Sequence, residues 1–131
     1  MQCIVVTPER TVRDEPAEFV AVTLFDGELG IAPGHTPLLG RLGFGEMRIT
    51  RSEHTDHYYI EGGFVEVLDD VVTVLTNRAL SADQIDEEVA EEQLQSALAK
   101  EARTPELMAV RQRAIAQSRA QILVAKRAKL I

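Results

Sequence analysis

The chain has 131 residues, of which 45% are hydrophobic and 27% charged, and its formal net charge is −7 at pH 7. These values are typical of one folded domain, or of a small domain with an appendage, and they exclude a disordered tail. The acidic balance argues against nucleic acid as a partner, because phosphate backbones are bound by basic faces. The single cysteine, Cys3, excludes an internal disulfide and a multi-cysteine zinc site.

The N-terminal residues do not resemble a signal peptide, because Pro8, Glu9 and Arg10 follow too soon after Met1. No apolar run approaches the length of about 18 residues that a membrane-spanning helix needs. We therefore expect the protein to reach a membrane only through another protein.

Short apolar runs between turn residues predict a β-rich part over residues 1–80. Strands are expected at residues 19–25, 47–51, 57–60, 64–68 and 71–75, with Gly62-Gly63 and Asp69-Asp70 as hairpin turns. Strands at this spacing indicate an antiparallel sandwich or barrel. The expected fold class is α+β, mainly β in residues 1–80 and helical in residues 81–131.

The segment from Gly27 to Leu39 predicts an exposed, rigid loop. Pro33 suits the second position of a turn, and Gly34 can take the positive φ that a type II turn needs next. We expect Leu38 and Leu39 to return to the core. Composition leaves open whether the loop is only a β-turn or a contact surface. The side chains that it is expected to present are Glu28, Leu29, Ile31 and His35.

Two helices are expected after Ser81. Ser81 and Gln84 match a capping box, and no Gly, Pro or aromatic residue occurs from Ser81 to Arg103. Thr104 and Pro105 then suit the N-cap and first position of a second helix that runs to about Lys129. The short break between the helices predicts an antiparallel hairpin.

These helices differ in charge. Residues 83–101 carry seven acidic side chains and one lysine, whereas residues 105–131 carry six basic side chains and one glutamate. Either the two arms attract each other and are otherwise solvated, or the basic arm can leave for an acidic surface on another subunit. Its basic residues are Arg111, Arg113, Arg119, Lys126, Arg127 and Lys129.

The sequence contains no Walker-type loop, Gly-x-Ser-x-Gly, His-Glu-x-x-His or Gly-x-Gly-x-x-Gly motif. His54 and His57 lie in a polar segment, residues 51–57, that predicts a surface hairpin loop, and they lack a third metal ligand at useful spacing. His35 has no nearby nucleophile and suggests a hydrogen bond that orders its loop. We expect neither an enzyme nor a metal site.

Three blocks in this order resemble the epsilon subunit of F-type ATP synthases: residues 28–39 (Glu-Leu-Gly-Ile-Ala-Pro-Gly-His-Thr-Pro-Leu-Leu), residues 62–67 and residues 72–76. The change to helices at Ser81 also matches. The resemblance implies a ten-stranded β-sandwich in a non-catalytic central-stalk subunit, with one face on the gamma subunit and one turn on the c-ring. It assigns ring contact to Glu28, Leu29 and Ile31. It assigns loop shaping to Gly30, Pro33, Gly34, His35 and Pro37.

The resemblance also implies that the hairpin regulates ATP hydrolysis. Folded on the sandwich it permits hydrolysis; extended along gamma, its basic helix meets the alpha and beta catalytic subunits and blocks rotation. Many members bind ATP through Ile/Leu-Asp-x-x-Arg-Ala, matched here by Ile85, Asp86, Val89 and Ala90. Val89 replaces the arginine and cannot bind phosphate. We therefore expect weak or absent ATP binding, and no cofactor.

The implied location is the cytoplasmic face of a bacterial inner membrane, or the stromal side of a plastid thylakoid, with peripheral attachment. A different class of protein is the alternative: a small-ligand binding module in which the hairpin is a lid. Such a module needs a concave apolar pocket with converging polar groups, and the sequence shows no such cluster.

Overall fold

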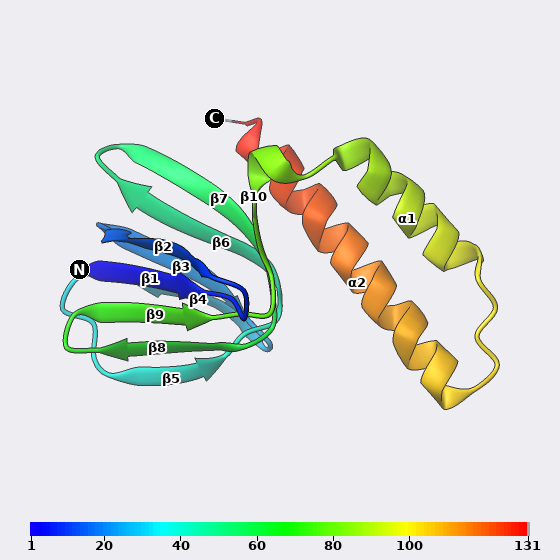
Figure 1. Ribbon diagram of the computed structural model, residues 1–131, viewed down its shortest axis with the longest axis horizontal. Helices are drawn as coiled ribbons and strands as arrows, with labels where there is room; N and C mark the ends of the chain where they lie inside the picture. Colours follow the sequence, from blue (N-terminus) through cyan, green and yellow to red (C-terminus); the bar gives the residue numbers. More distant parts are fainter. Residues whose placement is uncertain (131) are drawn as a thin grey trace.

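Alternating buried and exposed side chains build strands along the first 81 residues, and a helical hairpin follows them. The computed structural model describes residues 1–130, drawn in Figure 1. The strands are β1 (Gln2–Val6), β2 (Thr11–Pro16), β3 (Phe19–Leu24), β4 (Gly27–Ile31), β5 (Leu38–Arg41), β6 (Phe44–Arg51), β7 (His54–Glu61), β8 (Phe64–Leu68), β9 (Val71–Leu75) and β10 (Ala79–Ser81).

These ten strands form two five-stranded sheets, in the orders β2-β1-β9-β8-β5 and β10-β7-β6-β3-β4. All neighbours are antiparallel except β1 and β9, which are parallel. The sheets face each other around one apolar core, so the sandwich is confirmed and the barrel is not. Every residue of the core cluster lies between Cys3 and Ala79, and burial raises the pKa of the Cys3 thiol to about 11.

The two predicted hairpin turns have different outcomes. Asp69 and Asp70 both have positive φ and connect β8 to β9 as a hairpin, as predicted. Gly62-Gly63 is not a hairpin turn, because β7 and β8 lie in different sheets. Gly63 instead crosses the backbone of β9: its φ is +97°, and a Cβ there would lie 1.8 Å from the carbonyl oxygen of Leu75.

The helical part begins differently from the prediction. The Gln84 side chain accepts a hydrogen bond from the Ser81 backbone N–H, as the capping box requires. This capping box, however, starts only the short 3₁₀ helix η1 (Ala82–Gln84). The next two residues are not helical, and Asp86 then caps α1 (Glu87–Ala99). The second helix, α2 (Pro105–Ala128), has the predicted N-cap: the Thr104 hydroxyl accepts from the Leu107 N–H.

Helix α2 packs against β6 and β7, and α1 packs on α2 away from the sandwich (Figure 1). The residues of β6 and β7 under the hairpin alternate with those that face the core, so α2 covers the outer face of this sheet. The ring of Tyr59 is fully buried there, outside the core cluster. The buried residues of the hairpin helices are Ala90, Ala97, Ile115, Ser118, Ile122, Val124 and Ala125.

Candidate functional site

The turn-rich segment is half strand and half loop. Its first residues form β4 at the edge of one sheet, so side chains alternate between the two faces. Glu28 points outward and is exposed, whereas Leu29 packs partly on the core and Ile31 is fully buried. The expectation that Ile31 is exposed for ring contact is therefore wrong. Its position in the strand turns it inward.

The loop itself covers residues 32–37 and crosses from one sheet to the other. The predicted turn is present: Gly34 has φ +80° and the His35 N–H donates to the Ala32 carbonyl. The Gly34 N–H donates to an Asp70 carboxylate oxygen at 2.9 Å. The His35 imidazole Nδ1 lies 2.7 Å from the Thr36 carbonyl oxygen, which can only accept, so this nitrogen carries the proton.

Gly30 and the two prolines complete the residues expected to shape this loop. Gly30 lies in β4 under the ring of Phe19, which a Cβ would meet at 2.8 Å, so glycine is needed there for close packing. Pro33 and Pro37 are exposed at the two ends of the loop. Of the two leucines expected in the core, Leu38 packs against it, but Leu39 is 71% exposed on the other face of β5.

A surface of apolar side chains covers the outer face of the first sheet, and the sequence predictions missed it. Phe64 and Leu75 are opposite each other on β8 and β9, and both are about half exposed. Leu39 on β5 and Leu68 on β8 continue the same face. The sequence carried part of the signal, because the outward positions at the ends of β8 and β9 are apolar, although Glu66 and Thr73 lie between them. We call Leu39, Phe64, Leu68 and Leu75 the open sheet face.

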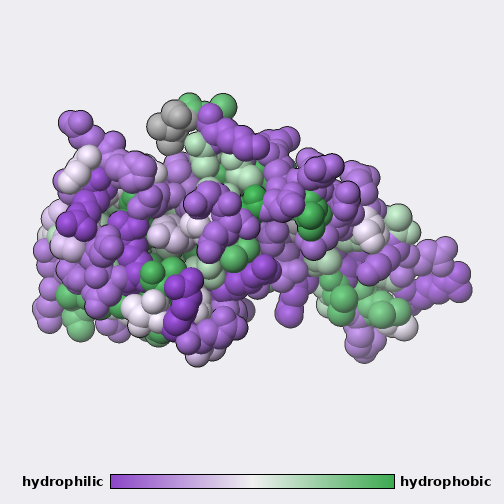
Figure 2. Space-filling model, turned by 45° about the horizontal axis from the view of Figure 1, so that its top comes forward, coloured by the Kyte–Doolittle hydropathy of each residue, from purple (hydrophilic) through white to green (hydrophobic). Residues whose placement is uncertain are grey.

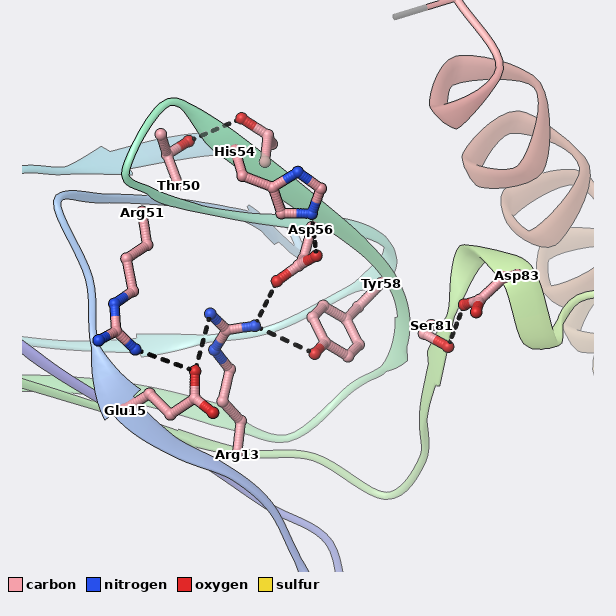
Figure 3. Close-up of polar contacts among 10 residues, drawn as sticks. Arg13, Glu15, Thr50, Arg51, His54, Asp56, Tyr58, Ser81 and Asp83 are labelled. Carbon is pink, nitrogen blue, oxygen red and sulfur yellow. Dashed lines mark hydrogen bonds and ion pairs between the residues drawn. The ribbon is translucent and has the colours of Figure 1, made fainter.

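The two histidines do not lie in a surface loop, since β6 and β7 run on to Arg51 and His54 and leave only Ser52 and Glu53 in the turn. The His57 ring is buried under the hairpin, where Nδ1 lies 3.1 Å from Glu46. Exposed His54 makes a hydrogen bond to Asp56 (Figure 3). Among residues 1–130, no three His, Cys, Asp or Glu side chains are placed to hold one metal ion.

Asp56 also belongs to an ion pair that joins the two sheets. The Arg13 guanidinium of β2 donates to Asp56 at 2.6 Å and to the Tyr58 hydroxyl at 3.3 Å, both on β7 (Figure 3). Burial alone would raise the pKa of Asp56, but hydrogen bonding and charge from Arg13 outweigh it, so this pKa lies below its usual value.

Three residues of the basic arm, two in α2 and one at its C-cap, are engaged within the chain. Arg127 reaches Glu46 of β6 at 3.2 Å, Lys129 reaches Glu87 of α1 at 2.6 Å, and Arg111 donates to the Leu98 carbonyl. The remaining basic side chains, Arg113, Arg119 and Lys126, are exposed and make no ion pair with another residue of the described chain.

The residues that match the ATP motif lie at the start of α1, beside a groove of about 1200 Å³ between β7 and the hairpin. The Asp86 carboxylate caps the helix by accepting from the Val89 N–H at 3.1 Å. Val89 is exposed and Ala90 is buried against α2. The groove contains both Ile85 and Asp86, and its other acidic lining residues are Asp56, Asp83, Glu87, Glu88 and Glu91.

A β-sandwich with a helical hairpin on the outer face of one sheet is the architecture of a small stalk subunit of a rotary ATP synthase. The chain belongs to the ATP synthase delta/epsilon chain family, whose β-sandwich domain model matches residues 1–82. It is similar to the ATP synthase epsilon chain of Rhodopirellula baltica, with 43% identity over 93% of this chain and 95% of the relative. The epsilon chain of Rubrobacter xylanophilus is 36% identical over 79% of this chain and 71% of that protein.

A solved structure supports the same fold. A chain in the Euglena gracilis mitochondrial ATP synthase structure, described as OSCP/F1/c-ring in rotational state 1, matches with a TM-score of 0.78 and 28% identity. The match covers 98% of this chain and 80% of that chain. Neither helix of the described residues is long and apolar enough to cross a membrane.

Proposed function

We propose that this chain is a non-catalytic central-stalk subunit that joins the gamma subunit to the c-ring and restrains ATP hydrolysis through its hairpin. The observation that carries the proposal is similarity to an epsilon chain over 93% of the sequence, sandwich and hairpin together. A ligand-binding module explains neither this similarity nor the acidic lining of the groove under the hairpin.

We assign the gamma contact to the open sheet face, which lies on the sheet that the hairpin does not cover. Its paired Phe64 and Leu75 offer an apolar contact, Arg41 lies beside Phe64, and Glu66 lies on β8 between Phe64 and Leu68, opposite Leu39. A set of exposed apolar side chains on an uncovered sheet is typical of a surface that another protein covers. In the view of Figure 2 most of the surface is hydrophilic, with apolar patches over the sandwich and at the end of the hairpin.

Binding to purified gamma subunit tests this assignment. Phe64→Asp combined with Leu75→Asp should weaken binding at least tenfold, because each buries a charge in the interface. Leu107→Asp is the matched control, since Leu107 is equally exposed but lies on α2. Equal loss in both variants would refute the assignment; circular dichroism checks that each variant is folded.

We assign the ring contact to Glu28 and Leu29 of β4 together with the exposed loop at residues 32–37. Ile31 supports this edge from inside the core. Glu28→Lys should weaken coupling of proton flow to rotation without unfolding the sandwich, because the Glu28 side chain is half exposed.

The regulatory part of the proposal is that the hairpin leaves the sandwich and brings its basic helix to the alpha and beta subunits. Ending the chain after Ser81, which keeps β10 intact, should leave assembly unchanged and raise ATP hydrolysis by the reconstituted complex. Lost assembly, or unchanged hydrolysis in a fully assembled complex, would contradict this division of labour.

The start of α1 is a poor ATP site in this chain. The motif arginine is absent, and acidic side chains outnumber basic ones in the groove that contains Ile85 and Asp86, where Lys129 is already paired to Glu87. We expect isothermal titration to detect no ATP binding in the micromolar range; a micromolar constant would disprove it. The location we propose is peripheral, on the cytoplasmic face of a bacterial inner membrane, with the plastid stromal side as the alternative.

A further inference from the structure

A carboxylate is buried where the hairpin meets the sandwich. The Glu46 side chain is 3% exposed, on the outer face of β6 beneath α2. One oxygen, Oε2, lies 3.1 Å from Nδ1 of His57. The other, Oε1, lies 2.7 Å from Nη1 of Arg48 and 3.2 Å from Nη1 of Arg127. Arg127 is the one ligand of Glu46 that comes from the hairpin, and the other two come from the sandwich.

Two arginines therefore share a single oxygen of Glu46. Their like charges repel each other, and the repulsion is reduced because Arg48 has a second acidic partner. Nη2 of Arg48 lies 2.5 Å from the carboxylate of Glu28, on the neighbouring outer face of β4. The four side chains Glu28, Arg48, Glu46 and Arg127 form a row with alternating charge, running from the edge strand to the hairpin. We call this row the ion-pair row.

We propose that the ion-pair row is a latch. Glu46 holds the hairpin on the sandwich by binding Arg127, and Glu28 sets the strength of this contact by also binding Arg48. With Glu28 in place, the ion-pair row carries two negative and two positive charges. Withdrawing Glu28, or giving it another cationic partner, leaves Arg48 fully available to Glu46 and makes Arg127 the surplus cation. The hairpin then docks less tightly.

This latch deepens the proposed function and depends on it in one respect. If Glu28 lies against the ring, contact there reaches the hairpin through only two side chains, Arg48 and Glu46. The latch also gives a second role to Arg127, which belongs to the basic arm expected to meet catalytic subunits. Glu46 competes with any such acidic surface for this guanidinium, so release requires the exchange of one carboxylate for another.

Hydrogen–deuterium exchange of the full, isolated chain tests the latch without any other subunit. Amides in the part of α2 that covers the sandwich report hairpin docking, and amides of β8 and β9 report the fold of the sandwich. The variants are Glu46→Gln, Arg127→Gln, the combination of these two, and Glu28→Gln both alone and combined with Arg127→Gln. Arg113→Gln is the matched control, because it removes an exposed arginine of the same helix that has no ion-pair partner among the described residues.

We expect Glu46→Gln and Arg127→Gln each to lower protection of α2 about fivefold, as for a partly exposed charge pair, with protection of β8 and β9 unchanged. The double variant should lose little more than either single one. Glu28→Gln should lower protection about twofold, and this effect should vanish when Arg127 is already replaced. Arg113→Gln should change nothing.

If Glu46→Gln and Arg127→Gln lowered the protection of α2 additively, the latch would be refuted. It would also be refuted if Arg113→Gln lowered this protection as much as Arg127→Gln does. An unchanged effect of Glu28→Gln in the Arg127→Gln background would overturn the part played by Glu28. If Glu46→Gln also loosens β8 and β9, Arg127→Gln decides, since its half-exposed side chain is outside the sandwich. None of these outcomes depends on ATP hydrolysis. The latch can therefore be correct when the proposed inhibition is wrong, and the inhibition can be correct when the latch is wrong.

Discussion

Gly63 is the residue at which backbone geometry limits the sequence most strongly. Its positive φ disfavours any side chain, and a Cβ would overlap the Leu75 carbonyl at 1.8 Å, where only backbone movement can relieve the clash. We expect Gly63→Ala to lower the free energy of unfolding by about 3 kcal/mol or more. Urea denaturation followed by circular dichroism measures it.

Gly34→Ala is the natural comparison for Gly63→Ala. Gly34 also has positive φ, at +80°, but no atom lies within 4 Å of the position of an added Cβ. Only the intrinsic left-handed penalty of about 1–2 kcal/mol then applies. Equal losses at the two glycines would show that the close approach at Gly63 does not matter.

The Arg13–Asp56 pair makes stability depend on pH. The pKa of Asp56 lies below its usual value because Arg13 favours the charged carboxylate, so the pair stabilises the folded chain above the unfolded pKa. That stabilisation is lost as pH falls through the lower, folded pKa. Asp56→Asn should therefore reduce unfolding free energy by about 1 kcal/mol at pH 6 and by almost nothing near pH 2. Urea titrations at both values measure the difference.

The control for Asp56→Asn is Asp26→Asn. Asp26 is exposed in the turn between β3 and β4 and belongs to none of the ion pairs found in residues 1–130. Its replacement should leave the pH dependence of unfolding unchanged. A constant difference between wild type and Asp56→Asn from pH 6 to pH 2 would mean that the carboxylate charge is not what Arg13 stabilises.

At the scale of elements, local capping chemistry predicts one of the two helix starts and misplaces the other. Thr104 and Pro105 specify one N-terminus by local chemistry alone, and the structure has it. Ser81 and Gln84 carry an equally good local signal, but a second cap at Asp86 follows and α1 starts there instead. Ser81 and Asp86 are two candidate caps five residues apart, and the local sequence does not say which one starts the longer helix.

Strand predictions failed where the partner of a strand was unknown. Ile31 follows glycines and precedes Pro33, which is typical of a loop, yet pairing of β4 with β3 turns it into the core. His57 lies among polar residues and becomes buried only because α2, more than fifty residues later, covers β7. The local pattern at Gly62-Gly63 predicts a hairpin turn, whereas the crossover between the two sheets depends on contacts distant in sequence. Local pattern predicted the elements; contacts distant in sequence determined which side chains are exposed.

Asp86 provides a prediction that belongs to α1. Its carboxylate is the N-cap, so Asp86→Ala should destabilise the first turn of α1 by about 0.5–2 kcal/mol, whereas Asp86→Asn should have almost no effect, since asparagine caps equally well. Hydrogen exchange of the Val89 and Ala90 amides measures the turn directly. If Asp86→Asn were as harmful as Asp86→Ala, the negative charge rather than the cap would be what this position requires.

At the scale of the whole molecule, the outer faces of the two sheets differ in what covers them. The hairpin and its buried Glu46 occupy the outer face of the sheet that contains β6 and β7, while the opposite sheet presents the open sheet face. The hairpin can therefore move without disturbing a partner on the other sheet. The regulatory role proposed for the hairpin requires this separation, because the hairpin and the sandwich must be able to open at different free energies.

The sandwich should fold without the hairpin. No helical residue belongs to the core cluster, which lies entirely between Cys3 and Ala79, and of the two long helices only α2 packs on the sheet that contains β6 and β7. The fragment 1–81 should consequently unfold in one cooperative transition, with a stability a few kcal/mol below that of the full chain because Tyr59 and Glu46 become solvated. Residues 82–131 alone should be only partly helical, since the sheet that covers Ile115 and Ile122 is missing. Urea denaturation of both fragments, followed by far-ultraviolet circular dichroism, measures this. A fragment 1–81 without a cooperative transition would mean that the hairpin is part of the structural core, and a hairpin that leaves the sandwich during rotation would then be physically excluded.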